Sequence, residues 1–266
     1  MKSRFLIVAF AWLSCQNLTF ASDLGLAYNQ NFVVTAATGK IAKKVAAQAD
    51  LYRRQIAKKW LGRRLPDGVQ RTNITVTLSK TEDRGRTWPI RSPRRSNHTI
   101  YLTSSADRVS GSTLKHEVAH VVLATHFGIH GRLPTWLEEG IASQYDDNRR
   151  QKIRNEFVSS RLGTTETQLS SLFRTKSIAA SRVGTYSLAE SLTRYLMSKG
   201  KTMPGRPADR LFAFAAEAKS SGWDRALRRN YNIDGVVTLQ KDWQRWVRAK
   251  RSRLSNASAT AEAARK

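Results

Sequence analysis

The 266-residue sequence has one cysteine, few acidic residues and few long apolar runs. A single Cys, Cys15, cannot form a disulfide within the chain, so the fold must depend on its hydrophobic core. Only 20 Asp and Glu face 46 Lys and Arg, which gives a formal net charge of +26. That excess favours association with polyanions such as nucleic acid, cell-wall polymers or anionic lipid, but it specifies no chemistry. We find no segment after residue 21 that is long and apolar enough to span a bilayer, so we expect no transmembrane anchor.

The N-terminal residues have the pattern of a secretory signal peptide. A basic start, Met1–Arg4, precedes an apolar run of nine residues, Phe5–Leu13, and the sequence Thr19-Phe-Ala21 has the small residues of a cleavage site. We predict a signal peptide over residues 1–21 and therefore a secreted or periplasmic protein. Cleavage before Cys15 would instead give a lipoprotein, although residues 12–14 match that pattern poorly.

The remaining sequence predicts one domain over residues 22–252, followed by a flexible tail over residues 253–266 that is rich in small and charged residues. A helical pattern occupies residues 41–61, and β-branched alternation predicts strands at 73–79 and 99–103. The segment between these strands, residues 84–98, has the Gly, Pro and Ser of a loop and holds five Arg. Helical periodicity dominates afterwards, at residues 134–145, 149–161, 186–197, 206–218, 223–231 and 239–249. The fold class predicted is α+β and mostly helical, with a small N-terminal sheet packed on a central helix.

That central helix contains the sequence His-Glu-Val-Ala-His. Residues four apart lie on the same face of a helix, so His116 and His120 can direct two imidazole nitrogens at one point. Glu117 lies about 100° around the helix, close enough to hold a water molecule beside that point. Two zinc ligands and a general base in this spacing are typical of metallopeptidases.

A catalytic zinc site needs a third protein ligand. His126 lies ten residues after His116, which is the ligand spacing of the metzincin pattern. That pattern needs a glycine seven residues after the first histidine, to turn the chain, and here the position is Leu123. Without a helix breaker, the helix should continue to about Phe127 and direct His126 away from the metal. We therefore look for the third ligand further along the chain.

The segment Trp136–Ala142, with the sequence Trp-Leu-Glu-Glu-Gly-Ile-Ala, supplies a candidate. Together with the His-Glu-x-x-His sequence it resembles the gluzincin zinc metallopeptidases, in the form of the peptidase MA-like domains of secreted bacterial proteins. In outline the resemblance covers residues 41–247, although only the two short motifs are specific. It implies a zincin-like fold, a Zn²⁺ cofactor and Glu139 as the third ligand, with Gly140 permitting close helix approach. Glu138, about 100° away, is expected to face solvent.

The resemblance also bears on the type of reaction. The Gly-x-Met-Glu-Asn sequence of the aminopeptidase branch is absent before the central helix, which favours an endopeptidase. Related enzymes stabilise the oxyanion with a Tyr or His from a later helix, and Tyr186 is the best-placed candidate. The family layout suggests that residues 100–103 form the sheet edge that pairs with an extended substrate. His98 at the start of that strand is a further cleft candidate.

The sequence therefore predicts a secreted zinc-dependent peptidase that cleaves peptide or protein substrates. In that mechanism, His116, His120 and Glu139 bind zinc, Glu117 acts as the base, and Tyr186 assists. The alternative from a different class is an exported basic protein that binds polyanions or cell wall on a former peptidase frame. A non-peptidase zinc hydrolase on the same frame is a third reading.

Overall fold

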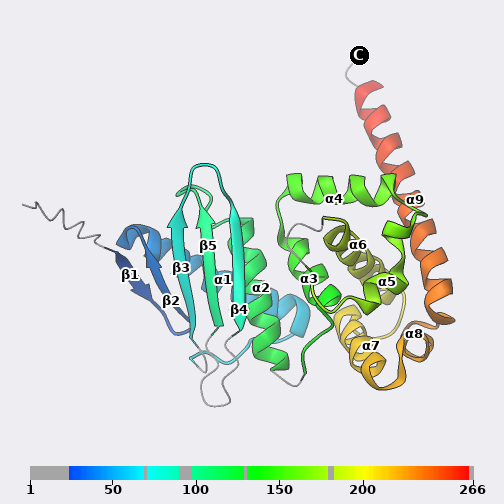
Figure 1. The fold of residues 1–266 in the computed structure, drawn as a ribbon, viewed down its shortest axis with the longest axis horizontal. Coiled ribbons are helices and arrows are strands. Elements are labelled where there is room, and N and C mark those ends of the chain that lie inside the picture. The colour runs from blue at the N-terminus through cyan, green and yellow to red at the C-terminus, as the bar shows by residue number, and fades with distance from the viewer. Residues whose placement is uncertain (1–23, 69–70, 90–97, 129–130, 179–182, 264–266) are drawn as a thin grey trace, which may run out of the picture.

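The computed structural model describes residues 24–68, 71–89, 98–128, 131–178 and 183–263, and side chains as far as residue 253. The predicted signal peptide lies outside these residues, and so does His130 in the turn after the central helix. The fold is α+β and mostly helical, as predicted, with a small sheet near the N-terminus and helices through the rest of the chain (Figure 1). Within the described residues, no helix is both long enough and apolar enough to cross a membrane.

The sheet has five strands in the order β1-β2-β3-β5-β4. The two outer pairs are antiparallel, and the inner pairs β2–β3 and β3–β5 are parallel. Its strands are β1 (Gly25–Tyr28), β2 (Phe32–Ala36), β3 (Thr72–Leu78), β4 (Arg84–Pro89) and β5 (His98–Ser104).

Two expectations about this sheet were wrong. β5 pairs with a strand on each side, so residues 100–103 are internal and cannot accept an added strand. The edge strand is β4, in a segment that we expected to be a loop. Glycine and proline suggested a loop, but exposure along Arg84–Trp88 alternates, which is the two-residue period of a strand.

Two helices cover one face of the sheet, α1 (Gly39–Leu61) and α2 (Ser112–Phe127) (Figure 1). In α1 the buried residues include Val45, Ala49, Ile56 and Trp60, which recur at helical spacing and form the apolar face. α2 contains the His-Glu-x-x-His sequence and continues without a break to Phe127, as the absence of glycine at position 123 predicts. The sheet and α1 therefore provide a buried support for α2.

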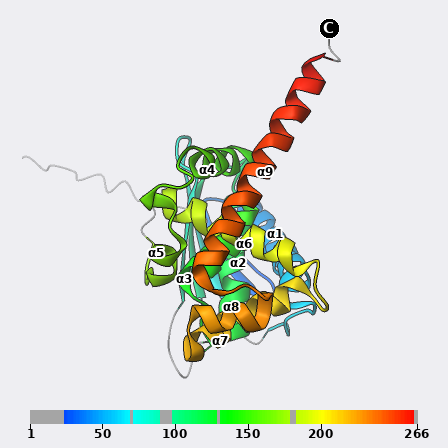
Figure 2. The same cartoon turned by 90° about the vertical axis from the view of Figure 1, so that its right-hand side faces the viewer.

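The second half of the chain is a group of helices around α6 (Figure 2), which contacts α3, α4, α7 and α9. α9 continues to Ala263, where the sequence predicted a flexible tail from residue 253. The elements are α3 (Thr135–Ala142), α4 (Asn148–Ser160), α5 (Leu169–Arg174), α6 (Val183–Gly200), α7 (Pro207–Ser221), α8 (Trp223–Tyr231) and α9 (Gly235–Ala263), with 3₁₀ turns at Ser143–Tyr145 and Thr165–Thr167.

The short helix α3 is fixed by close packing on α6. A Cβ atom at Gly140 would lie 2.2 Å from the Thr193 hydroxyl and 2.5 Å from the Ala189 carbonyl oxygen, so only glycine fits there. Trp136, on the same helix, is fully buried and packs against Phe173 and Trp223. The partner in the close approach is α6, whereas we expected it to be α2.

Candidate metal centre

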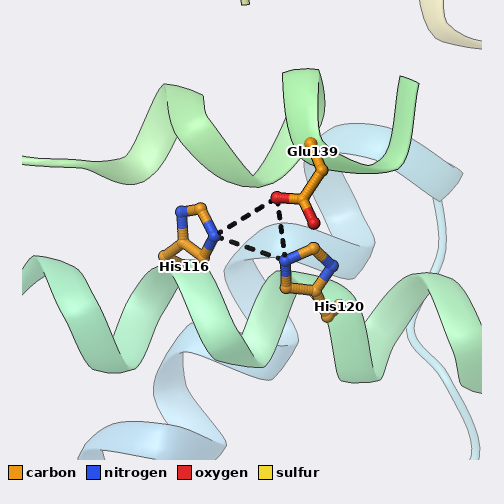
Figure 3. Close-up of side chains that lie close together, drawn as sticks. All are labelled: His116, His120 and Glu139. Atoms are coloured by element: carbon orange, nitrogen blue, oxygen red, sulfur yellow. Dashed lines mark hydrogen bonds and ion pairs between the residues drawn. The ribbon is translucent and has the colours of Figure 1, made fainter. Parts of the chain in front are cut away.

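Three predicted ligands converge between α2 and α3. His116 and His120 project from one face of α2, and Glu139 reaches toward them from α3 (Figure 3). The two histidine Nε2 atoms lie 3.3 Å apart. Glu139 Oε2 lies 3.8 Å from Nε2 of His116 and 3.6 Å from Nε2 of His120. The structure thus brings all three together, from two helices.

These separations fit a metal ion. A tetrahedral ion with bonds of about 2.0–2.2 Å holds its ligand atoms about 3.3–3.6 Å apart. Two of the three separations lie in this range, and the third, from Glu139 to His116, is slightly longer at 3.8 Å. The donor set of two imidazoles and one carboxylate is one that catalytic metal sites use. Glu139 Oε2 is also buried without a hydrogen-bond partner, so it has an unused acceptor at the centre of the cluster.

Electrostatics at this point also favour a cation. Burial lowers the pKa of His120, but the neighbouring carboxylates of Glu139 and Glu138 outweigh it and raise the pKa well above its ordinary value. Burial raises the pKa of Glu139, and the two histidines reverse the effect and lower it. The raised pKa of His120 shows that its surroundings stabilise positive charge, and the lowered pKa of Glu139 keeps its carboxylate ionised. The same surroundings would stabilise a bound cation.

Buried charged side chains lie next to His116 on the side of the ring opposite the proposed metal. Its Nδ1 lies 3.1 Å from Asp146, whose side chain is 3% exposed. The other oxygen of Asp146 lies 2.5 Å from the Arg154 guanidinium, and Arg154 also pairs with the buried Glu190 at 3.2 Å. Burial raises the pKa of Asp146, but His116 and Arg154 more than offset this and lower it. An ionised carboxylate this close to Nδ1 favours the tautomer with the proton on Nδ1, which leaves Nε2 free to bind a metal.

His120 has a weaker support. Its Nδ1 lies 3.5 Å from Glu138, and Glu138 is in turn 3.6 Å from the half-exposed Arg132. The expectation that Glu138 faces solvent was wrong: its side chain is 17% exposed and turned toward the site. Consecutive residues of α3 do differ by about 100° around the helix axis. Even so, α3 packs closely enough that both Glu138 and Glu139 lie against α2.

Glu117 lies beside the ligands, held against the edge strand β4. The Thr87 hydroxyl donates a 2.6 Å hydrogen bond to Glu117 Oε2. A Cβ atom at Gly85 would lie 2.4 Å from Glu117 Cγ, so the space for this side chain exists only with glycine at position 85. The carboxylate is buried, at 5% exposure, yet it lines the cleft described next.

The cleft consists of two hollows of about 310 and 640 Å³ that meet at the site. Both are lined by Gly85, His116, Glu117 and Tyr186, so these four residues mark the middle of the cleft. Burial raises the pKa of the Tyr186 hydroxyl, and the Glu139 and Glu117 carboxylates add to the effect. Tyr186 is therefore a protonated donor near both carboxylates.

The remaining described histidines lie outside the metal cluster. His126 is half-buried on α2 and its Nδ1 lies 3.5 Å from the Arg63 guanidinium, away from the cleft. This position agrees with setting it aside as a ligand. His98 is buried at 5% exposure with neither ring nitrogen paired, and burial lowers its pKa while Glu138 opposes that shift. It lines neither hollow of the cleft.

Four supporting residues were missed from the sequence: Gly85, Thr87, Asp146 and Arg154. The first two could have been found, because Arg84, Arg86 and Trp88 alternate with them at the two-residue spacing of a strand. The last two gave no signal, since an aspartate and an arginine among 66 charged residues have no distinctive spacing.

Comparison with known proteins adds no further information about the site. None of the protein-family models, curated proteins or solved structures compared with this chain matches it. The functional argument therefore rests on the geometry of the site itself.

Proposed function

We propose that the protein is a zinc-dependent peptidase. The observation that carries this proposal is the convergence of His116, His120 and Glu139 on one point, with the Glu117 carboxylate beside it in an open cleft. Two histidines and a glutamate are a ligand set of zinc hydrolases, and an adjacent carboxylate is the base that hydrolysis needs. Zinc suits these nitrogen and oxygen donors and their tetrahedral spacing.

Each residue has a role in hydrolysis. When bound here, zinc would supply Lewis-acid chemistry, activating a water and polarising the scissile carbonyl. Glu117 accepts a proton as the water oxygen attacks the carbonyl carbon, and it delivers a proton to the amine nitrogen as the C–N bond breaks. Thr87, through its hydrogen bond to Oε2, orients the carboxylate so that Oε1 is the oxygen left for this transfer. Tyr186, a neutral donor, is the candidate to stabilise the oxyanion.

The shape of the cleft supports an endopeptidase. Hollows extend to both sides of Glu117, so a chain can continue in either direction from the scissile bond. Within the described residues β4 is the sheet edge beside the site, and an exposed edge strand can pair with an extended peptide. A secreted or periplasmic location, by way of a signal peptide over residues 1–21, remains part of the proposal.

The test combines metal analysis with cleavage of an unstructured protein such as casein. We expect one zinc per chain, cleavage that a chelator abolishes and zinc restores, and a loss of about 10³-fold or more in Glu117→Gln with zinc retained. A wild type without zinc, or a Glu117→Gln variant that cleaves normally, would disprove the mechanism.

The second function considered, polyanion binding by a former peptidase, is distinguished in the same experiment. It is favoured by the net charge of +26. It predicts zinc-independent binding to nucleic acid or wall polymer with a steep dependence on salt, and no chelator-sensitive cleavage.

A further inference from the structure

A further cavity lies between α4, α6 and α9, and it shares Arg154 with the smaller hollow of the proposed catalytic cleft. Its volume is about 830 Å³, against 640 and 310 Å³ for the two hollows of the cleft. Cavities of about 300–1,000 Å³ hold small-molecule ligands in many proteins. Nothing in peptide hydrolysis requires it, so it needs an explanation of its own.

The lining of this cavity is predominantly basic. Five Lys and Arg line it against two Glu, and both Glu are already paired: Glu190 with Arg154 and Arg194, and Glu156 with Lys152. Arg194 lies 2.5 Å from Glu190 and donates a 2.8 Å hydrogen bond to Gln151. Amide and hydroxyl groups of α4 and α6 complete the polar wall. Those groups belong to Asn148, Gln151, Asn155, Ser159, Ser160, Ser187 and Ser191.

Lys250 is the cation without a counterion. Within the described residues no carboxylate lies within 4 Å of its Nζ, and its contacts are Asn155 Oδ1 at 3.5 Å and the ring of Trp246 at 5.6 Å. Burial and the nearby Arg194 lower the pKa of Lys250, and Glu190 acts in the opposite direction. A half-buried cation beside a second cation gains from an anion between or beside them.

The wall formed by α9 is apolar. Trp246 is half-buried and Val247 is buried at 6% exposure, and both line the cavity next to Lys250. The cavity therefore combines a cationic end with an aromatic and aliphatic side. A ligand that fits both has an anionic headgroup and an apolar or ring-bearing body.

We propose that this cavity is a binding site for a small organic anion. Lys250 and Arg194 bind its phosphate or carboxylate group, the Asn155 amide donates a further hydrogen bond, and Trp246 packs against its body. The site shares Arg154 and Glu190 with the network behind His116, but it contains none of the proposed zinc ligands nor Glu117, and it does not depend on the peptidase proposal.

Three probes test the two parts of the ligand by calorimetry at low salt. Phenyl phosphate carries both parts with a phosphate, benzoate carries both with a carboxylate, and inorganic phosphate carries the headgroup alone. We expect one site per chain for phenyl phosphate or benzoate, bound at least about tenfold more tightly than inorganic phosphate, because ring burial contributes more than 1.4 kcal/mol. The tighter of the two ring compounds identifies the headgroup. Equal affinity for inorganic phosphate would overturn the assignment of a ring-bearing ligand.

Lys250→Gln is the test variant and Lys241→Gln is its control. Each removes one positive charge from α9. Lys241 is exposed and lies outside the cavity. We expect Lys250→Gln to weaken binding at least about tenfold, as loss of a charged hydrogen bond does, and Lys241→Gln to change it less than about twofold. Both should keep the wild-type melting temperature, because neither lysine has an ion pair in the described structure. Equal losses in the two variants, or no saturable binding of any probe, would overturn the proposal.

Discussion

The two histidines of the candidate metal centre stand in different surroundings. Behind His116 the chain has a buried network, Asp146–Arg154–Glu190, with contacts of 2.5–3.2 Å. Behind His120 it has Glu138, at 3.5 Å, whose ion-pair partner among the described Lys and Arg is the half-exposed Arg132. The same residue type on the same helix face is thus rigidly positioned at one end and loosely at the other.

The difference follows from the position of the two histidines in the fold. His116 is one turn closer to the start of α2 and faces the junction of α4 and α6, where charged residues are enclosed and must be paired. His120 lines the larger hollow of the cleft, and its partner Glu138 pairs with Arg132, a half-exposed side chain that water can replace. We infer that most of the electrostatic support for the metal comes from the His116 side, and the predictions below test that inference.

The largest effect is expected from removing the ligand common to both sides. Glu139→Ala should abolish zinc binding, because Glu139 Oε2 is the atom that both histidine Nε2 atoms face. His126→Ala, on the same helix but turned toward Arg63, should retain one zinc per chain. Metal analysis after dialysis against zinc-free buffer measures both, and zinc retention by Glu139→Ala would contradict the assignment.

How much of this site the sequence predicts depends on how far each residue lies from its neighbours along the chain. The pair His116 and His120 follows from helix geometry alone, and the continuous helix that sets His126 aside follows from Leu123. Glu139 could be predicted as the third ligand only from the family resemblance. No rule of sequence spacing says which carboxylate on a second helix lies close to the two histidines on the first.

The residues that support these ligands were beyond such reasoning. Asp146 reaches His116 because the 3₁₀ turn Ser143–Tyr145 packs on α2, and Arg154 is placed behind Asp146 because α4 packs on α6. Both are contacts between elements that the sequence alone does not pair. The edge strand was missed for another reason: the Gly85 that makes room for Glu117 is the residue that suggested a loop. A glycine required for close approach and a glycine required for a turn look the same in a sequence.

The second prediction concerns the stability of the buried network. Arg154→Met leaves Asp146 and Glu190 without their shared partner, and it should lower the free energy of unfolding by about 3 kcal/mol or more. Arg132→Met, on the His120 side and half-exposed, should change it by less than about 0.5 kcal/mol. Urea unfolding of the zinc-free protein measures both, since bound zinc would add its own stabilisation. Equal effects would remove the distinction between the two sides.

The third prediction is the effect of Asp146 on metal affinity. Asp146→Asn keeps the volume but removes the charge that fixes the Nδ1 proton of His116, so zinc affinity should fall by about 10- to 100-fold. Competition with a chelator of known affinity at pH 7.5 measures the loss. A circular dichroism spectrum identical to the wild type shows that the variant is folded, and unchanged affinity would mean that Asp146 serves stability alone.

The smallest effect is expected at the other histidine. Glu138→Gln removes the corresponding charge behind His120, but the 3.5 Å contact is long and Arg132 already balances part of the charge. Zinc affinity should therefore fall by less than about threefold, within the range of a weak, solvent-screened partner. The same competition assay compares it directly with Asp146→Asn, because both substitutions replace a carboxylate by its amide. A loss as large as that of Asp146→Asn would show that Glu138 closes onto His120 when the metal binds, and that the two supports are equivalent in the metal-bound protein.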